Sequence, residues 1–151
     1  MSEHASVTLQ QIENYRFDNH FAEGGHQLQT DEPAPLGSDS GPSPSQLLAA
    51  AVANCLSASL LFASRKFHID FEPLRCEASA LVDRNERNRL RVLRIDVTLR
   101  AGKPVGAAAS LERLLGSFED FCTVSQSVGQ GIPIHVTVLD ADGTVLKQPV
   151  V

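Results

Sequence analysis

The sequence has no tryptophan, and its 151 residues include only one tyrosine, one methionine and three cysteines. Three cysteines are too few, and an odd number, for the disulfide framework of a small secreted domain, so any disulfide should be reversible. Positive charge is also scarce, because 13 Lys and Arg stand against 18 Asp and Glu, giving a net charge of -5. A protein that neutralises many phosphates needs an excess of Lys and Arg, so nucleic acid is not an expected partner.

Two further signals are missing. Residues 1–17 contain no basic segment followed by an apolar run, which predicts a cytoplasmic protein without a signal peptide. No Cys-x2-Cys or His-x3-His spacing occurs, so a zinc site is not expected. The GxGxxG and P-loop patterns are also absent, so no bound cofactor is expected. The 42% hydrophobic content is that of an ordinary globular protein, and the length predicts a single domain over residues 1–151.

The N-terminal third reads as strands followed by a loop. Residues 6–30 mix polar and apolar side chains around Gly24 and Gly25, which predicts two antiparallel strands joined by a glycine-containing turn. Residues 31–45 contain four prolines and two glycines, which exclude regular backbone structure. We therefore expect an ordered surface loop after the strands.

A helix is strongly predicted after this loop. Ser43 can cap it and Pro44 occupies the first helical position, where a missing N–H costs nothing. Residues 46–66 are apolar on nearly every face, so the helix is expected inside the protein. One stripe at helical spacing consists of Leu47, Ala51, Asn54 and Ala58. Alanine dominates and Asn54 interrupts the apolar run, which favours a core helix over a membrane span of about 20 strongly apolar residues.

The remaining sequence alternates between strands and short helices. Residues 74–83 and 90–100 predict a hairpin with one solvated face, because apolar and polar side chains alternate along the second strand. Residues 107–121 predict an amphipathic helix, and residues 123–128 a short one that stops at Gly129, a suitable left-handed cap. Residues 132–138 alternate again, and Asp142-Gly143 is a tight-turn signal. The stripe of the amphipathic helix consists of Leu111, Leu114, Leu115, Phe118 and Phe121.

The three cysteines differ in their expected surroundings. Cys55 lies in the apolar helix, where a cysteine is by default a buried and inert thiol. Cys122 lies at the start of the short helix, where unpaired N–H groups favour a thiolate and lower the pKa. Cys76 falls in a strand and is assigned to sheet packing. These positions alone leave a redox role and a purely structural role both open.

Two motifs resemble those of the OsmC/Ohr family. GPSPSQLLAAAVANCLSASL, residues 41–60, resembles the motif in which Gly, Pro and Leu precede an Ala-rich helix with a peroxidatic cysteine, here Cys55. FCTVSQSVGQGIPIHVTV, residues 121–138, resembles the second motif, an aromatic-Cys-x-Val-Ser segment before a core strand, with Cys122 in the resolving position. The order of the predicted elements also matches over essentially the whole chain.

The resemblance implies a fold and a reaction. The fold is α+β, an intertwined homodimer with antiparallel sheets wrapped around two central helices and active sites at the dimer interface. The reaction is thiol-dependent reduction of organic hydroperoxides: Cys55 becomes a sulfenic acid and Cys122 captures it as a disulfide. An external dithiol reductant, lipoylated or of the thioredoxin type, would then restore the thiols.

One part of the family pattern is absent. In the peroxidase branches an Arg, held by a Glu near the start of the long helix, activates the peroxidatic thiol, but Ser45 stands in the position of that Glu. His26 rather than an Arg follows Gly25. Arg16 and His26 are the candidate cations, with Asp31 or Glu32 to orient them. Two alternatives to the enzyme are a binding module for an apolar small molecule and a dimer whose cysteines only pack.

Overall fold

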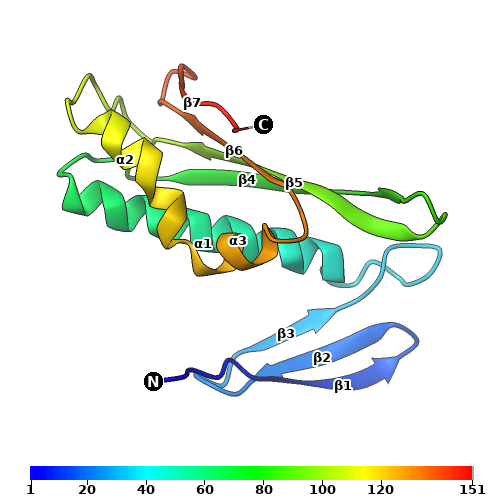
Figure 1. Cartoon of the computed structure of the whole chain (residues 1–151). Helices are drawn as coiled ribbons and strands as arrows, with labels where there is room; N and C mark the ends of the chain where they lie inside the picture. The colour runs from blue at the N-terminus through cyan, green and yellow to red at the C-terminus, as the bar shows by residue number, and fades with distance from the viewer. Residues whose placement is uncertain (151) are drawn as a thin grey trace. The chain divides into compact units, whose positions relative to one another are not determined.

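The computed structural model describes residues 1–150 and divides the chain into two compact units (Figure 1). The N-terminal unit is Met1–Leu47, and the C-terminal unit is Leu48–Val151.

The N-terminal unit contains a three-stranded antiparallel sheet, in the order β1 (Val7–Glu13), β2 (Arg16–Phe21) and β3 (Gln27–Thr30). The prediction of two strands was wrong, because a turn at Asn14 divides the first of them. Asn14 adopts a left-handed conformation with φ 47°, which Asn tolerates better than most residues do. The sequence has no glycine at this turn, so the turn was not predicted. The predicted turn at Gly24 and Gly25 joins β2 to β3, and both glycines have positive φ.

Polar contacts hold the interior of this unit. The amide of Asn19 donates to the Thr30 hydroxyl at 2.9 Å and to the Leu28 carbonyl at 3.0 Å. The buried carboxylate of Asp31 accepts five hydrogen bonds from backbone and hydroxyl groups of Glu32, Ser38 and Ser40. The bonds from Ser38 and Ser40 lower the pKa of Asp31 far below its usual value. They also connect the beginning of the predicted proline-rich loop to its middle.

The long helix α1 (Pro44–Lys66) begins at the predicted cap. The Gln46 backbone N–H donates to the Ser43 hydroxyl at 3.3 Å, and the Ser43 N–H donates to the Gln46 side chain at 2.8 Å, a reciprocal capping box. By length and composition alone α1 could cross a membrane, but a core helix passes the same test. A stripe of this helix that includes Leu56 is fully buried in the core.

One side of α1 is buried in this chain, although the sequence predicted a helix inside the protein with apolar residues on nearly every face. Ala51, Asn54 and Ala58 are exposed, as is Phe62, whose exposed fraction is 67%. The buried stripe comprises Val52, Leu56 and Leu60, because large aliphatic side chains gain more from burial than alanine does. An alanine-rich helix gives little contrast between faces, so its sequence alone does not identify the core side.

The C-terminal unit contains a four-stranded sheet in the order β4 (Arg75–Arg84), β5 (Leu90–Arg100), β6 (Ile134–Leu139) and β7 (Val145–Lys147). The predicted β4–β5 hairpin is confirmed. The sheet is mixed rather than antiparallel throughout, because β5 and β6 pair in parallel. Parallel neighbours need a crossover, and residues 101–133 provide it.

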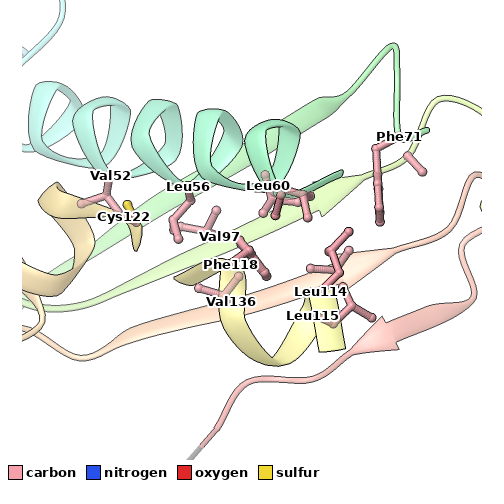
Figure 2. Packing of buried hydrophobic residues seen from close by; sticks show 14 of the residues in the cluster. Val52, Leu56, Leu60, Phe71, Val97, Leu114, Leu115, Phe118, Cys122 and Val136 are labelled. Carbon is pink, nitrogen blue, oxygen red and sulfur yellow. The ribbon is translucent and has the colours of Figure 1, made fainter. Parts of the chain in front are cut away.

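The crossover carries three helices: α2 (Leu111–Ser117), the 3-10 helix η1 (Phe118–Phe121) and α3 (Thr123–Val128). Leu114, Leu115 and Phe118 are buried as predicted, but Phe121 is 66% exposed. Phe121 is the last residue of η1, and the backbone becomes extended at Cys122, so the helical stripe ends there. The core cluster combines residues of α1, of the sheet and of the crossover helices. It includes Val97, Val136 and Phe118 (Figure 2). The predicted α+β class is confirmed.

Gly129 follows α3 as predicted, but not in a left-handed conformation, since its φ is -61°. The reason for glycine here is space, because an added Cβ would lie 2.8 Å from the Ser125 carbonyl oxygen.

Candidate functional site

Cys122 is the N-cap residue of α3 and is completely buried. Its sulfur accepts a hydrogen bond from the Ser125 backbone N–H at 3.4 Å, and the Ser125 hydroxyl donates to the Cys122 carbonyl at 3.3 Å. The Cys122 N–H donates to the Glu119 carbonyl at 3.0 Å, which joins η1 to α3. In Figure 2, Cys122 lies at the Val52 end of the core cluster. The sequence correctly predicted this position at a helix start.

Cys55 lies midway along α1 and is half-buried. It packs against the core cluster that contains Cys122, its thiol raises the pKa of Cys122, and both cysteines are free. Cys55 is adjacent on the helix to buried Val52 and also to the exposed Ala51 and Ala58. The pair therefore joins the packed interior of the C-terminal unit to the uncovered face of α1.

The electrostatics of Cys122 differ from the prediction. Burial raises the pKa of Cys122, and the neighbouring Cys55 thiol raises it further, whereas hydrogen bonds from Ser125 lower it. The expected lowering by the helix N-terminus does occur through Ser125, but desolvation of a fully buried thiolate outweighs it. Cys122 thus holds its proton more tightly than a free cysteine does.

Cys76 occupies a different place, on β4. Its sulfur lies 4.0 Å from the Ala53 carbonyl oxygen, so the side chain packs against α1. Desolvation raises the pKa of Cys76, while contact with Ser57 lowers it.

Lys147 on β7 braces the turn before Cys122. Its ammonium lies 2.7 Å from the Glu119 carboxylate, donates to the Leu115 carbonyl at 2.8 Å, and stands 5.5 Å from the centre of the Phe118 ring. The Glu119 carbonyl is the acceptor for the Cys122 N–H. A strand far along the chain therefore helps to hold the segment that carries the buried sulfur.

Arg16 is the first residue of β2, after the turn that divides the predicted first strand. Its guanidinium pairs with Glu13 at 2.5 Å rather than with the carboxylates expected to orient it, and its Nε is buried without a hydrogen-bond partner. The Asp31 carboxylate instead accepts hydrogen bonds from Ser38 and Ser40. Arg16 and Asp31 both line a cavity of about 220 Å³ within the N-terminal unit. Both cysteines of the candidate pair belong to the other unit.

The other two positions lie near turns or helix ends. His26 follows the turn at Gly24, where a Cβ would meet its ring at 2.6 Å, and is exposed. Ser45 lies in the first turn of α1 and is half-buried. Within residues 1–150, no group of three or more His, Cys, Asp or Glu side chains is arranged to hold a metal ion.

Sequence reasoning missed Ser125 as a site residue. The signal was present, because Ser125 stands three positions after Cys122, the spacing at which a cap residue and its helix exchange hydrogen bonds. A cysteine is not an obvious cap, so the spacing alone does not single out Ser125.

Comparison with known proteins adds three findings. The OsmC family model, described as OsmC-like protein, matches residues 37–137. No curated protein sequence matches the chain. Among solved structures, an OsmC-like protein of Mycoplasma pneumoniae is 16% identical and covers 91% of this chain and 99% of its own, with a TM-score of 0.73.

Two other solved structures are named for organic hydroperoxide resistance. The protein of Elizabethkingia anophelis is 16% identical, covers 91% of this chain and 96% of its own, and has a TM-score of 0.73. OhrB of Bacillus subtilis is 16% identical, covers 90% and 98%, and has a TM-score of 0.68. At such low identity these structures establish a shared fold.

Proposed function

Because the chain belongs to the OsmC-like family, we propose that it is a thiol peroxidase that reduces organic hydroperoxides through Cys55 and Cys122, with a role in peroxide detoxification. The observation that carries the proposal is the packing of Cys55, at the edge of the core, against the buried cluster that contains Cys122. Similarity to proteins named for organic hydroperoxide resistance supports the choice of substrate class.

The reaction has two steps on the protein. The Cys55 thiolate attacks the outer peroxide oxygen, the O–O bond breaks, and the alcohol leaves with a proton while Cys55 becomes a sulfenic acid. The Cys122 sulfur then attacks the Cys55 sulfur, a disulfide forms, and the hydroxyl leaves as water. An external dithiol, on a lipoylated or thioredoxin-type protein, reduces the disulfide and resets the pair.

The surroundings of the two thiols support this division of roles. Cys55 is half-buried and adjoins the exposed face of α1, so a peroxide can reach it. Cys122 is completely buried and its pKa is raised, which disfavours it as the first nucleophile. Cys122 instead lies where it can meet the oxidised Cys55.

Arg16 is our proposed activating cation in place of the Arg–Glu pair of the family. Its Nε has no acceptor although it is buried, and its charge is partly balanced by Glu13. Arg16→Lys should slow the first step and Arg16→Gln should slow it more, because only the lysine variant retains a positive charge. Equal rates of Cys55 oxidation in the wild type and in Arg16→Gln would remove Arg16 from the mechanism.

We also propose a homodimer, because apolar side chains are exposed in both units. Val7, Leu9 and Phe21 share one face of the N-terminal sheet, and Phe62 lies on the exposed face of α1. Exposed apolar patches of this kind mark association surfaces. Phe62→Asp should lower the molar mass measured by light scattering to that of a monomer, while Leu90→Asp, at a comparably exposed apolar position, should leave it unchanged. A monomeric wild type would overturn this proposal.

The deciding experiment measures consumption of tert-butyl hydroperoxide and hydrogen peroxide by the dithiol-reduced protein. Cys55→Ser should abolish turnover, Cys122→Ser should stop the protein at the sulfenic acid, and Cys76→Ser should behave as wild type. The organic peroxide should be preferred. Absence of turnover in the wild type would refute the peroxidase and leave a binding module for an apolar small molecule as the leading function.

A further inference from the structure

We propose that Ser125 is a positioning residue for Cys122, whose hydroxyl prepares the buried sulfur for attack on the Cys55 sulfenic acid and so sets the rate of disulfide formation. This inference rests on the function proposed above, and it concerns only the second step of the reaction.

The geometry fixes Ser125 beside the sulfur. Ser125 is buried, its backbone N–H donates to the Cys122 sulfur at 3.4 Å, and its carbonyl accepts the Gly129 N–H at 2.8 Å. The Ser125 backbone is therefore hydrogen-bonded on both sides, to Cys122 and to Gly129. The hydroxyl donates to the Cys122 carbonyl at 3.3 Å and is also close enough to the thiol to influence its titration.

Cys122 needs such a donor because its surroundings oppose ionisation. Burial and Cys55 both raise the pKa of Cys122, and hydrogen bonds from Ser125 are what lowers it. Among the described residues, the titratable group that acts on Cys122 is Cys55, from α1. In η1 the neighbouring carboxylate of Glu119 is paired with Lys147. A hydrogen-bond donor to a buried thiolate favours its charged form without adding a charge.

The Ser125 hydroxyl would act in the reaction of Cys122 with the Cys55 sulfenic acid. The Cys122 S–H loses its proton, the sulfur forms a bond to Cys55, the S–O bond of the sulfenic acid breaks, and the hydroxyl combines with a proton to leave as water. A hydroxyl has one proton to donate. In the resting thiol that proton is directed to the Cys122 carbonyl. In the proposed step the hydroxyl turns toward the sulfur as negative charge develops there.

The test compares Ser125→Ala with Ser127→Ala in protein that carries Cys76→Ser. Ser127 is a matched control, since it lies on the same helix and its exposed hydroxyl donates to the Thr123 carbonyl at 2.8 Å. Alanine is favourable in a helix, and the substitution leaves the backbone N–H of residue 125 in place, so the hydroxyl alone is removed. Single-turnover reactions would monitor sulfenic acid by dimedone trapping and disulfide by mass.

We expect Ser125→Ala to slow disulfide formation roughly tenfold, the size of effect expected for one hydrogen bond to a charged group. Its pH profile should move to higher pH, while the rate of sulfenic acid formation stays unchanged. Ser125→Thr should restore the rate, and Ser127→Ala should match the wild type. A disulfide rate and pH profile in Ser125→Ala equal to those of Ser127→Ala would overturn the inference.

A peroxide-free measurement separates this inference from the proposed function. In protein with Cys55→Ser and Cys76→Ser, the ultraviolet absorbance of the Cys122 thiolate should titrate at higher pH when Ser125→Ala is added. An unchanged titration would overturn the role of Ser125 even if the wild type consumed peroxide. A shifted titration, together with no peroxide turnover by the wild type, would support the effect of Ser125 on Cys122 and refute the peroxidase.

Discussion

The two units bury opposite kinds of side chain. Within residues 1–150, the buried apolar residues all come from the C-terminal unit, from Ala49 to Val138. The buried residues of the N-terminal unit are polar: Asn19, Thr30, Asp31 and Ser43. Hydrogen bonds are directional, so they can specify the shape of a small sheet and loop, but each contributes only about 1 kcal/mol net. Because polar groups fill the interior of the N-terminal unit, its apolar side chains, such as Val7 and Leu9, remain exposed.

The largest expected effect comes from cutting into the apolar core. Leu56→Ala should lower the free energy of unfolding by about 2–5 kcal/mol, because it removes a fully buried side chain and leaves a cavity. Urea denaturation measures the change. Leu90→Ala, at an exposed position, is the control and should cost roughly 0.5 kcal/mol or less. Similar costs at both positions would contradict the assignment of the core to α1.

The next effect falls on the polar unit. Because the pKa of Asp31 is lowered in the folded state, its carboxylate contributes stability above the unfolded pKa, and this is lost as pH falls below about 4. Asp31→Asn should reproduce the acid effect at neutral pH, since fewer of the loop donors keep an acceptor. Hydrogen exchange at Ser38 and Ser40 should accelerate first, while the core amides of β5 stay protected. Simultaneous loss of protection in both regions would show that the units open together.

A smaller effect is expected where α1 begins. Ser43→Ala removes one half of the capping box and should cost about 1 kcal/mol. Ser45→Ala, two residues later, is the control and should be nearly neutral. Thermal or urea unfolding of the two variants measures the difference, and equal stability would mean that the cap does not contribute.

The smallest expected effect is a loss of stability of the C-terminal unit at alkaline pH. The raised pKa of Cys122 means that its contribution is fully present below the unfolded pKa, about 8.5, and declines as pH rises through the folded value. Alkaline pH should therefore weaken the C-terminal unit, whereas acid weakens the N-terminal unit. Cys122→Ala should flatten the alkaline decline in a series of urea titrations, and an unaltered decline would exclude this thiol as its cause.

The sequence predicted local structure better than it predicted faces and partners. Ser43, the β4–β5 hairpin and the position of Cys122 all follow from short-range rules of capping and alternation, and all are confirmed. The buried side of α1 depends on which residues of other elements meet it, and alanine gives little local contrast. The parallel β5–β6 pairing and the raised pKa of Cys122 are likewise tertiary effects, because distant segments create them.

The candidate site divides in the same way. Its two cysteines could be located from motifs, whereas the ion pair of Arg16 with Glu13 and the role of Ser125 depend on distances that no motif encodes. The carboxylates expected beside Arg16 show the limit clearly. Asp31 and Glu13 are both carboxylates, and the sequence alone does not distinguish them. In the structure the Ser38 and Ser40 hydroxyls donate to Asp31, and Arg16 pairs with Glu13.

The parallel pairing of β5 and β6 also bears on the order of folding. The β4–β5 hairpin is a local structure that can form early, whereas β6 must close a loop over residues 101–133 before it pairs. Cys122 lies inside that loop, and Val136 and Val138 of β6 belong to the same buried cluster. Because β6 follows Cys122 in the chain, both thiols leave the ribosome before the strand that closes the loop around Cys122.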